Sequence, residues 1–246
     1  MHLTSIENAR RFFAAYPMEG ATVLDIGSQD VNGSLRGVCP YQYTGVDFVS
    51  GRGVDVVLTD PYKLPMADGS VDIITSSSCF EHSELFWVLF LEIVRVLKPH
   101  GLFYLNVPSN GDVHRFPLDC WRFYPDAGSA LATWARLNGY PVCRVESYTS
   151  NRKDSVWNDY VAVFLKDERY LDRYPNRITD GYSDYLNGSN GRRRATYTQD
   201  QRSPVWAARR IFYFLKTPGA VNRSFQIIGD ILTGKRTRLL PEAPDG

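Results

Sequence analysis

Two acidic residues, each at the end of an apolar run, have the positions in this chain that most favour ligand chemistry. Asp25 lies in the segment VLDIGSQDVNGS, which passes through Gly27 and Gly33. Asp47 follows about 20 residues later, in YTGVDF. Glycines let the backbone approach a ligand closely, and a carboxylate offers two acceptor oxygens to the two hydroxyls of a ribose. The spacing therefore predicts a nucleoside-like ligand at the ends of two neighbouring strands.

The elements that would hold these residues alternate between apolar runs and helical segments. Helices are expected over about residues 4–15, 85–97 and 126–137, and strands over residues 21–26, 42–46, 54–58, 71–76, 101–107, 143–148 and 160–165. The early runs are almost continuously apolar, which is typical of parallel strands covered on both faces. The order predicts an α/β fold with a doubly wound, mostly parallel, seven-stranded Rossmann-like sheet. Residues 151–158 are polar, and as a hairpin loop they would make the last strand antiparallel.

Composition and charge limit the class of protein. The 246 residues carry a net charge of +1, and none of the four cysteines lies within three residues of another. That spacing disfavours a zinc knuckle and fits a reduced, cytoplasmic protein. The N-terminus has charges where a signal peptide needs an apolar core. The longest apolar run, residues 86–97, is broken by Glu92 and Arg95 and is too short to span a bilayer.

The charge is unevenly distributed between the two ends of the chain. Residues 166–246 carry 15 Lys and Arg against 9 Asp and Glu, whereas residues 1–165 carry 13 against 18. We therefore predict a ligand-binding domain over residues 1–166 and a basic, aromatic-rich C-terminal extension over residues 167–246, irregular at first and then amphipathic over 205–215. The extension is either a solvated tail or a contact surface for an anionic substrate, a peripheral membrane or a partner. Its basic cluster is too small, on an acidic body, for a nucleic-acid binder.

Four segments in order resemble class I S-adenosyl-L-methionine (SAM)-dependent methyltransferases, and among them the small-molecule, type 11-like branch. They are VLDIGSQDVNG, YTGVDF, LTDPYKLPMADGSVDIITSSSCFEH and LEIVRVLKPHGLFYLNVP, which together span roughly residues 21–110. The combination of LP-x-ADGS-x-D and LKP-x-G is specific to that branch. The resemblance implies a SAM-binding enzyme that transfers a methyl group.

The resemblance also implies roles for residues at the ends of the strands. Asp25 and Gly27 would begin the loop around the methionine moiety, and Asp47 would accept the ribose hydroxyls. The other implied cofactor residues are Asp60 and Pro61 beside the adenine, and Ser77 and Ser78 near the methionine end.

The first loop departs from the family pattern at one position. The family usually has a second glycine two positions after the first, whereas Gly27 is followed by Ser28 and Gln29. Ser28, Gln29 and Asp30 are therefore expected to make cofactor contacts that differ from the usual ones. A nicotinamide dinucleotide is disfavoured, because the G-x-G-x-x-G fingerprint is absent.

Candidates for the acceptor side lie in two places. Glu81 and His82 follow the fourth strand, and residues 108–127 form a loop after the fifth. We predict catalytic roles for His82, His114 and Asp119, since an alcohol acceptor needs a base to take its proton. Aromatic rings can stack on a sugar and guanidinium groups can hold an anion. The predicted substrate-binding residues are Arg115, Trp121, Arg122 and Tyr124.

Structural alternatives accompany each of these roles. His82 could cap a helix or bond to the loop backbone, Asp119 could pair with Arg122, and the two aromatic side chains could cover the sheet edge. No metal site is predicted, since no ligands have convincing spacing.

The leading hypothesis is O-methylation of a hydroxyl of a sugar, a glycan intermediate or another small molecule. The phrase FPLDCWRFYPDAGSALATWARLNGY resembles methyltransferases of bacterial surface-polysaccharide pathways. The alternatives are an N- or C-methyltransferase for another metabolite and a non-catalytic binding or scaffold module with the same fold. The sequence does not choose among acceptors.

Overall fold

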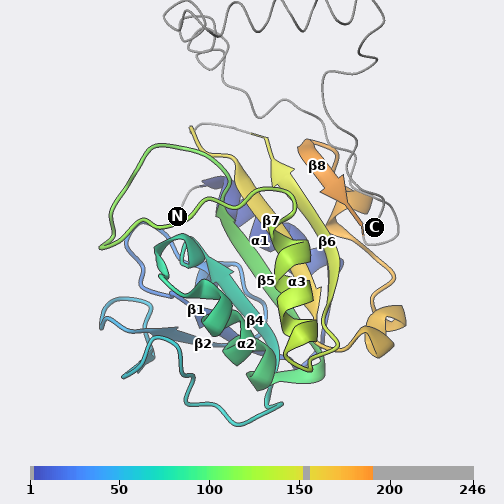
Figure 1. Cartoon of the computed structure of the whole chain (residues 1–246), viewed down its shortest axis with the longest axis horizontal. Helices are drawn as coiled ribbons and strands as arrows, with labels where there is room; N and C mark the ends of the chain where they lie inside the picture. Colours follow the sequence, from blue (N-terminus) through green and yellow to red (C-terminus); the bar gives the residue numbers. More distant parts are fainter. Residues whose placement is uncertain (1–2, 152–155, 191–246) are drawn as a thin grey trace, which may run out of the picture. The chain divides into compact units, whose positions relative to one another are not determined.

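One mixed eight-stranded sheet organises the part of the chain that the structure, a computed structural model, describes: residues 3–151 and 156–190 (Figure 1). The strand order is β3-β2-β1-β4-β5-β7-β6-β8. The strands are β1 (Thr22–Ile26), β2 (Gln42–Asp47), β3 (Val56–Val57), β4 (Val71–Ser77), β5 (Leu97–Pro108), β6 (Cys143–Ser150), β7 (Asp159–Leu165) and β8 (Tyr185–Ser189). All seven predicted strands are present, so the α/β Rossmann-like class is confirmed and the count of seven is one short.

Two hydrophobic layers cover the sheet, because successive strand residues point to opposite faces. On β5, Phe103 and Leu105 belong to the layer under α2 (Phe86–Val96) and α3 (Ala127–Leu137). Leu102 and Tyr104 belong to the layer under α1 (Leu3–Ala15). Figure 1 shows α2 and α3 on the near face and α1 behind the sheet. Burial of both faces explains the continuous apolar runs.

The direction of the strands places the carboxyl ends of five of them at one edge. β1, β2, β3 and β4 run parallel, and β5 pairs parallel with β4. β7 is antiparallel to both β5 and β6, as a hairpin between the last two strands predicts. Open α/β sheets bind ligands outside the carboxyl ends of their strands, so the loops after these five strands carry the candidate site.

The sheet continues past residue 166, where the sequence suggested a boundary. β8 pairs antiparallel with β6, and the segment between β7 and β8 contains two short 3-10 helices, η3 (Glu168–Arg173) and η4 (Ile178–Asp180). The fully buried Glu146 accepts hydrogen bonds from the backbone of Ile178 at 2.8 Å and from the hydroxyl of Tyr16. Residues 167–190 are therefore a folded edge of the sheet, not the irregular segment we predicted.

Other expectations for the C-terminal extension fall outside the described residues. The predicted amphipathic stretch at 205–215 and the arginine cluster at 192–194 lie in residues 191–246. Within residues 3–151 and 156–190, no helix combines the length and the apolar character that crossing a bilayer requires.

Candidate active site

The loop after β1 packs closely against its neighbours. Gly27 has φ +77°, and a Cβ added there would lie 2.5 Å from the Cβ of Cys79. The amides of Gly27 and Ser28 both donate to the carbonyl of Val46, at 3.0 and 3.2 Å. Only glycine meets both the backbone conformation and the space at position 27, so the loop is fixed between β2 and the segment after β4.

Asp47 lies where the family resemblance puts a ribose-binding carboxylate. It is the last residue of β2 and is buried, and its two oxygens accept backbone hydrogen bonds of 3.1 Å from Gln29 and from Val49. Each carboxylate oxygen has a further lone pair. The side chain is therefore held in place and still offers an acceptor on each oxygen to a diol.

Asp25 has two protein partners. The hydroxyl of Thr75 donates to its Oδ1 at 2.6 Å, and the hydroxyl of Tyr43 donates to its Oδ2. Burial raises the pKa of this carboxyl to about 6. These contacts connect β1 to β4 and to β2, so Asp25 supports the loop after β1. A direct contact of Asp25 with the methionine moiety stays a prediction.

Two buried hydroxyls at the strand ends suit a polar cofactor. Ser28 and Ser77 are each 4% exposed, and their Oγ atoms have no hydrogen-bond partner among the described residues. A buried hydroxyl is normally hydrogen-bonded. Ser78 follows with φ +55° and donates its amide to Asn106 at 2.9 Å. The loop residues present therefore fit a ligand that brings its own donors and acceptors, as SAM would.

The remaining predicted cofactor residues occupy the same edge of the sheet. Gln29 is half-buried, and Asp30 pairs with Arg52 at 3.0 Å, which joins the loop after β1 to the loop after β2. Asp60 and Pro61 are exposed in the loop after β3, where Asp60 accepts a hydrogen bond from the amide of Tyr62 at 2.8 Å. Their proximity to adenine stays a prediction.

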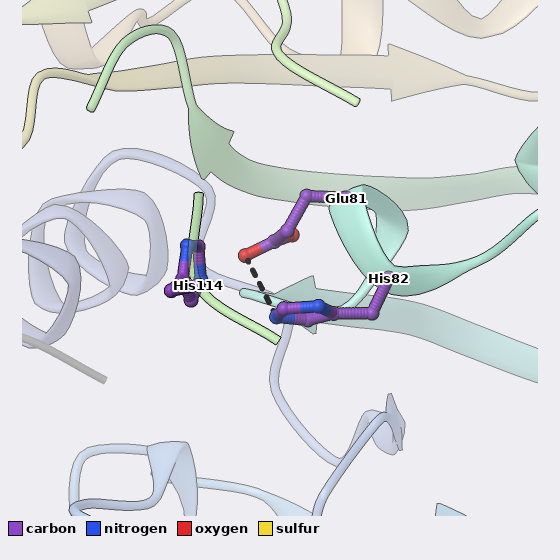
Figure 2. A group of neighbouring side chains, drawn as sticks. All are labelled: Glu81, His82 and His114. Atoms are coloured by element: carbon purple, nitrogen blue, oxygen red, sulfur yellow. Dashed lines mark ion pairs between the residues drawn. The ribbon is translucent and has the colours of Figure 1, made fainter. Parts of the chain in front are cut away.

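Three titratable side chains meet at the acceptor end. Glu81 and His82 belong to η2 (Phe80–His82), directly after β4, and His114 comes from the loop after β5 (Figure 2). One oxygen or nitrogen of each lies within 4.8 Å of those of the others. The Nε2 of His82 is 3.7 Å from Oε1 of Glu81, and the two histidine rings are 5.0 Å apart. The structure thus brings two predicted catalytic residues together with a third that the sequence only pointed to.

The surroundings of Glu81 and His82 change their protonation. Burial raises the pKa of Glu81 to about 8, although the positive charge of Arg122 opposes the shift. Burial lowers the pKa of His82, against a hydrogen bond from its Nδ1 to the carbonyl of Leu118 that raises it. His82 is therefore neutral at pH 7, with the lone pair on Nε2. This bond to the loop backbone is the structural role that we weighed against catalysis.

Asp119 and Arg122 form an ion pair inside the loop. Two guanidinium nitrogens of Arg122 contact the two carboxylate oxygens, one of them at 2.8 Å, and the hydrogen bonds lower the pKa of Asp119 to about 2. Asp119 also accepts the amide of His114 at 2.6 Å. Asp119 thus positions His114, and Arg122 is already committed to a carboxylate instead of being free for a substrate anion.

The loop after β5 is anchored to the segment after β4. The amides of Cys120 and Trp121 both donate to the carbonyl of Glu81, at 2.8 and 3.1 Å. The indole nitrogen of Trp121 donates to the carbonyl of Ser83 at 2.9 Å, which fixes the ring. Trp121 is 37% exposed, Tyr124 is 62% exposed and Arg115 is exposed. These three predicted substrate residues therefore remain available at the surface.

Trp157 is a member of the site that the sequence did not suggest. Its ring lies 4.8 Å from that of His114 and 5.6 Å from the guanidinium of Arg122. A Cβ at Gly111 would overlap it, at 1.9 Å from the ring. A tryptophan in a polar loop was the only signal for this role. Trp157 forms a wall beside His114.

Comparison with known proteins supports the interpretation of this edge of the sheet. Residues 24–105 match the family model described as a methyltransferase domain. This chain contains a class I SAM-dependent methyltransferase domain. SAM is therefore its cofactor, in agreement with the carboxylate at the end of β2.

The methyltransferase domain has relatives in mycobacteria. An uncharacterized methyltransferase of Mycobacterium bovis is 32% identical over 142 residues, which cover 51% of this chain and 54% of the relative. One from Mycobacterium ulcerans is 39% identical over 83 residues, covering 32% of this chain and 31% of that protein. This chain thus spans about half the length of the first relative.

Solved structures share the fold of the methyltransferase domain. One is the 1,6-didemethyltoxoflavin-N1-methyltransferase of Burkholderia thailandensis, with its substrate and S-adenosylhomocysteine bound; the TM-score is 0.51 at 18% identity, over 66% of this chain and 78% of that one. Another is a putative sarcosine dimethylglycine methyltransferase of Galdieria sulphuraria, with a TM-score of 0.50 at 16% identity, over 68% and 86%. At such identities the likeness concerns the fold alone.

Replacing Asp47 with alanine tests the cofactor site. The loss of a buried, hydrogen-bonded acceptor is expected to weaken SAM binding by about 1–3 kcal/mol, or about 5–150-fold, in calorimetric titrations. Asp47→Asn keeps one acceptor oxygen and should lose less. Asp68→Asn is the control, since the Asp68 side chain is 80% exposed and pairs with Arg95. Unchanged affinity in Asp47→Ala would place the ribose elsewhere.

Proposed function

We propose that the whole chain transfers the methyl group of SAM to a hydroxyl of a sugar, a glycan intermediate or another small molecule. The observation that carries the proposal is the cluster of Glu81, His82 and His114 beside the cofactor loop. Cys79 connects the two, because Gly27 packs against it and Glu81 follows two residues later. A hydroxyl acceptor needs such groups, since it has a proton to lose as it attacks.

Each part of the site has a task in this reaction. When bound, SAM would supply a methyl group on a positively charged sulfur, and in-line attack by the acceptor oxygen would break the carbon–sulfur bond and leave its electron pair on sulfur. Asp47 and the loop after β1 hold the nucleoside and methionine ends. Nε2 of His82 receives the proton of the acceptor hydroxyl, because its other nitrogen is bonded to Leu118. Holding the two reactants in line supplies much of the rate.

The exposed rings of the loop favour a sugar-like acceptor. Trp121 packs edge-on against Phe86 and Trp87, with ring centroids 5.4 and 5.7 Å away, and its indole direction is fixed by Ser83. Tyr124 is more exposed still. Aromatic side chains held at a site edge line many small-molecule pockets. A contact of the basic residues 191–246 with an anionic substrate or surface belongs to the same proposal and rests on charge alone.

A panel of acceptors tests the reaction. The purified full chain is incubated with SAM carrying a labelled methyl group and with nucleotide-linked sugars, glycan intermediates, phenols and amines. We expect label in a hydroxyl-bearing small molecule, with equal release of S-adenosylhomocysteine. Label found solely in amines would move the reaction to nitrogen, the second candidate. Label confined to protein or RNA would exclude a small-molecule acceptor.

A further inference from the structure

Glu81 has a buried carboxyl group, one oxygen of which has no hydrogen-bond partner among the described residues. The residue is 1% exposed, and the oxygen in question is Oε2. Leaving a buried carboxylate without a donor or a cation is costly. An imidazole lies close by without bonding to it: Nε2 of His82 is 3.7 Å from the other oxygen, beyond hydrogen-bonding distance.

The distances match the spacing of ligands around one ion. Two ligand atoms about 2.1 Å from a tetrahedral metal lie about 3.4 Å from each other. The pair Glu81 and His82 is close to that value, and the ligand atoms of Glu81, His82 and His114 all lie within 4.8 Å of one another. Figure 2 shows the three side chains directed toward the same space from two segments of the chain.

His82 has the outer contact that orients a metal ligand, and His114 has a carboxylate close to its second nitrogen. A ligating histidine usually gives its second nitrogen to a carbonyl or a carboxylate. The Nδ1 of His82 is bonded to the carbonyl of Leu118. The Nδ1 of His114 lies 3.4 Å from Oδ2 of Asp119 and 3.3 Å from a guanidinium nitrogen of Arg122. The ring of His82 is thus arranged to present Nε2, and the carboxylate of Asp119 is within reach of His114 as its outer partner.

The local charge also favours a cation. Asp119 neutralises Arg122, the one cationic side chain among these contacts, through their ion pair. The carboxylate of Glu81 brings a negative charge to the group when it is ionised, and a divalent ion would compensate that charge.

We propose that Glu81, His82 and His114 bind one divalent transition-metal ion. Two imidazoles and one carboxylate suit zinc and its neighbours better than magnesium, which prefers oxygen ligands. Three protein ligands leave at least one coordination position for water or for an acceptor oxygen. With an ion bound, Nε2 of His82 would be a ligand and not the base: the ion would lower the pKa of an acceptor hydroxyl bound to it, and the proton of that hydroxyl would leave to solvent water.

Metal content is the direct test. The tag-free full chain is stripped with a chelator, dialysed against Zn²⁺ and analysed for zinc by elemental mass spectrometry. We expect one tightly held ion per chain. Glu81→Gln and His114→Ala should each weaken binding by more than about 100-fold, and Asp119→Asn, an outer contact, by about 10–100-fold. His114 is suited to replacement because its side chain is 40% exposed.

The histidine content of the chain provides matched controls. There are four histidines, at positions 2, 82, 100 and 114. His100→Ala lies at the opposite end of β5, beside Asp72, and should bind zinc as the parent does. Absence of stoichiometric zinc in the parent, or equal zinc in the parent and His114→Ala, would overturn the proposal and leave Glu81 as a protonated acid.

Calorimetry with SAM on the stripped chain separates this proposal from methyl transfer. SAM binding to the stripped chain, with methylation restored by zinc, supports the ion. If the stripped chain methylates at the full rate without any ion, the metal proposal is wrong and the proposed function stands. If His114→Ala loses zinc binding but the parent chain methylates no acceptor, the metal proposal stands and the proposed function is wrong.

Discussion

Replacing His82 with asparagine is expected to lower the rate of methyl transfer by about 10²–10⁴-fold, the usual contribution of a positioned acid or base. The amide nitrogen of asparagine occupies roughly the place of Nδ1, so it can still donate to the carbonyl of Leu118. What the substitution removes is the lone pair on Nε2. The effect should therefore appear in kcat, whether that nitrogen takes a proton or binds an ion.

Two companion measurements make the His82 result specific. Affinity for SAM should be unchanged in His82→Asn, since the contacts at Asp47 are untouched. His100→Asn should retain the parent rate, because His100 lies at the far end of β5. His82→Gln, which loses the bond to Leu118, should in addition raise KM for the acceptor by loosening the loop. A His82→Asn variant with the parent kcat would remove His82 from the reaction.

Replacing Gly27 with alanine is expected to lower the free energy of unfolding by about 2–5 kcal/mol. The left-handed backbone at φ +77° costs an L-residue about 1–2 kcal/mol. The new Cβ would also lie 2.5 Å from the Cβ of Cys79 and 2.7 Å from its Sγ, and such overpacking typically costs about 1–3 kcal/mol. Urea unfolding of the full chain measures the sum.

Gly139 separates these two contributions. It has φ +85°, but a Cβ there meets nothing within 4 Å. Gly139→Ala should therefore lose about 1–2 kcal/mol, from the backbone conformation alone. Adding Cys79→Gly to Gly27→Ala should recover the clash part, which a double-mutant cycle reads as a coupling energy. If Gly27→Ala and Gly139→Ala are equally stable, the close packing of the loop against Cys79 is wrong.

The sequence predicted the centre of the fold well because burial determines it. Strands such as β4 and β7 have every residue buried, so they appear as continuous apolar or small-residue runs between turns. β8 was missed because its sequence, YLNGS, contains no apolar run and it forms by pairing at an edge. A peripheral strand of that kind depends on its neighbour β6 more than on its own composition.

The two ends of the site differed in predictability. The cofactor end lies within a few residues of β1 and β2, so Gly27 and Asp47 could be placed from strand ends alone. The acceptor end is assembled from segments more than 30 residues apart: His114 reaches Glu81 only because the loop after β5 folds back over η2. The spacing of residues along the chain does not predict such a contact. The contact of Trp157 with His114 could not be predicted for the same reason.

The anchoring of the acceptor loop has a consequence for engineering. The carbonyl of Glu81 receives two amides of the loop, and the carbonyl of Ser83 receives the indole of Trp121. The backbone of residues 81–83 therefore holds both the loop with Trp121 and the cluster of Glu81, His82 and His114. If residues 109–126 were replaced by the corresponding loop of another methyltransferase, the new loop would lack the backbone carbonyls to which it normally bonds. Residues 79–83 must therefore be exchanged together with the loop. Acceptor preference, on the proposed function, would then be exchanged by replacing both segments together.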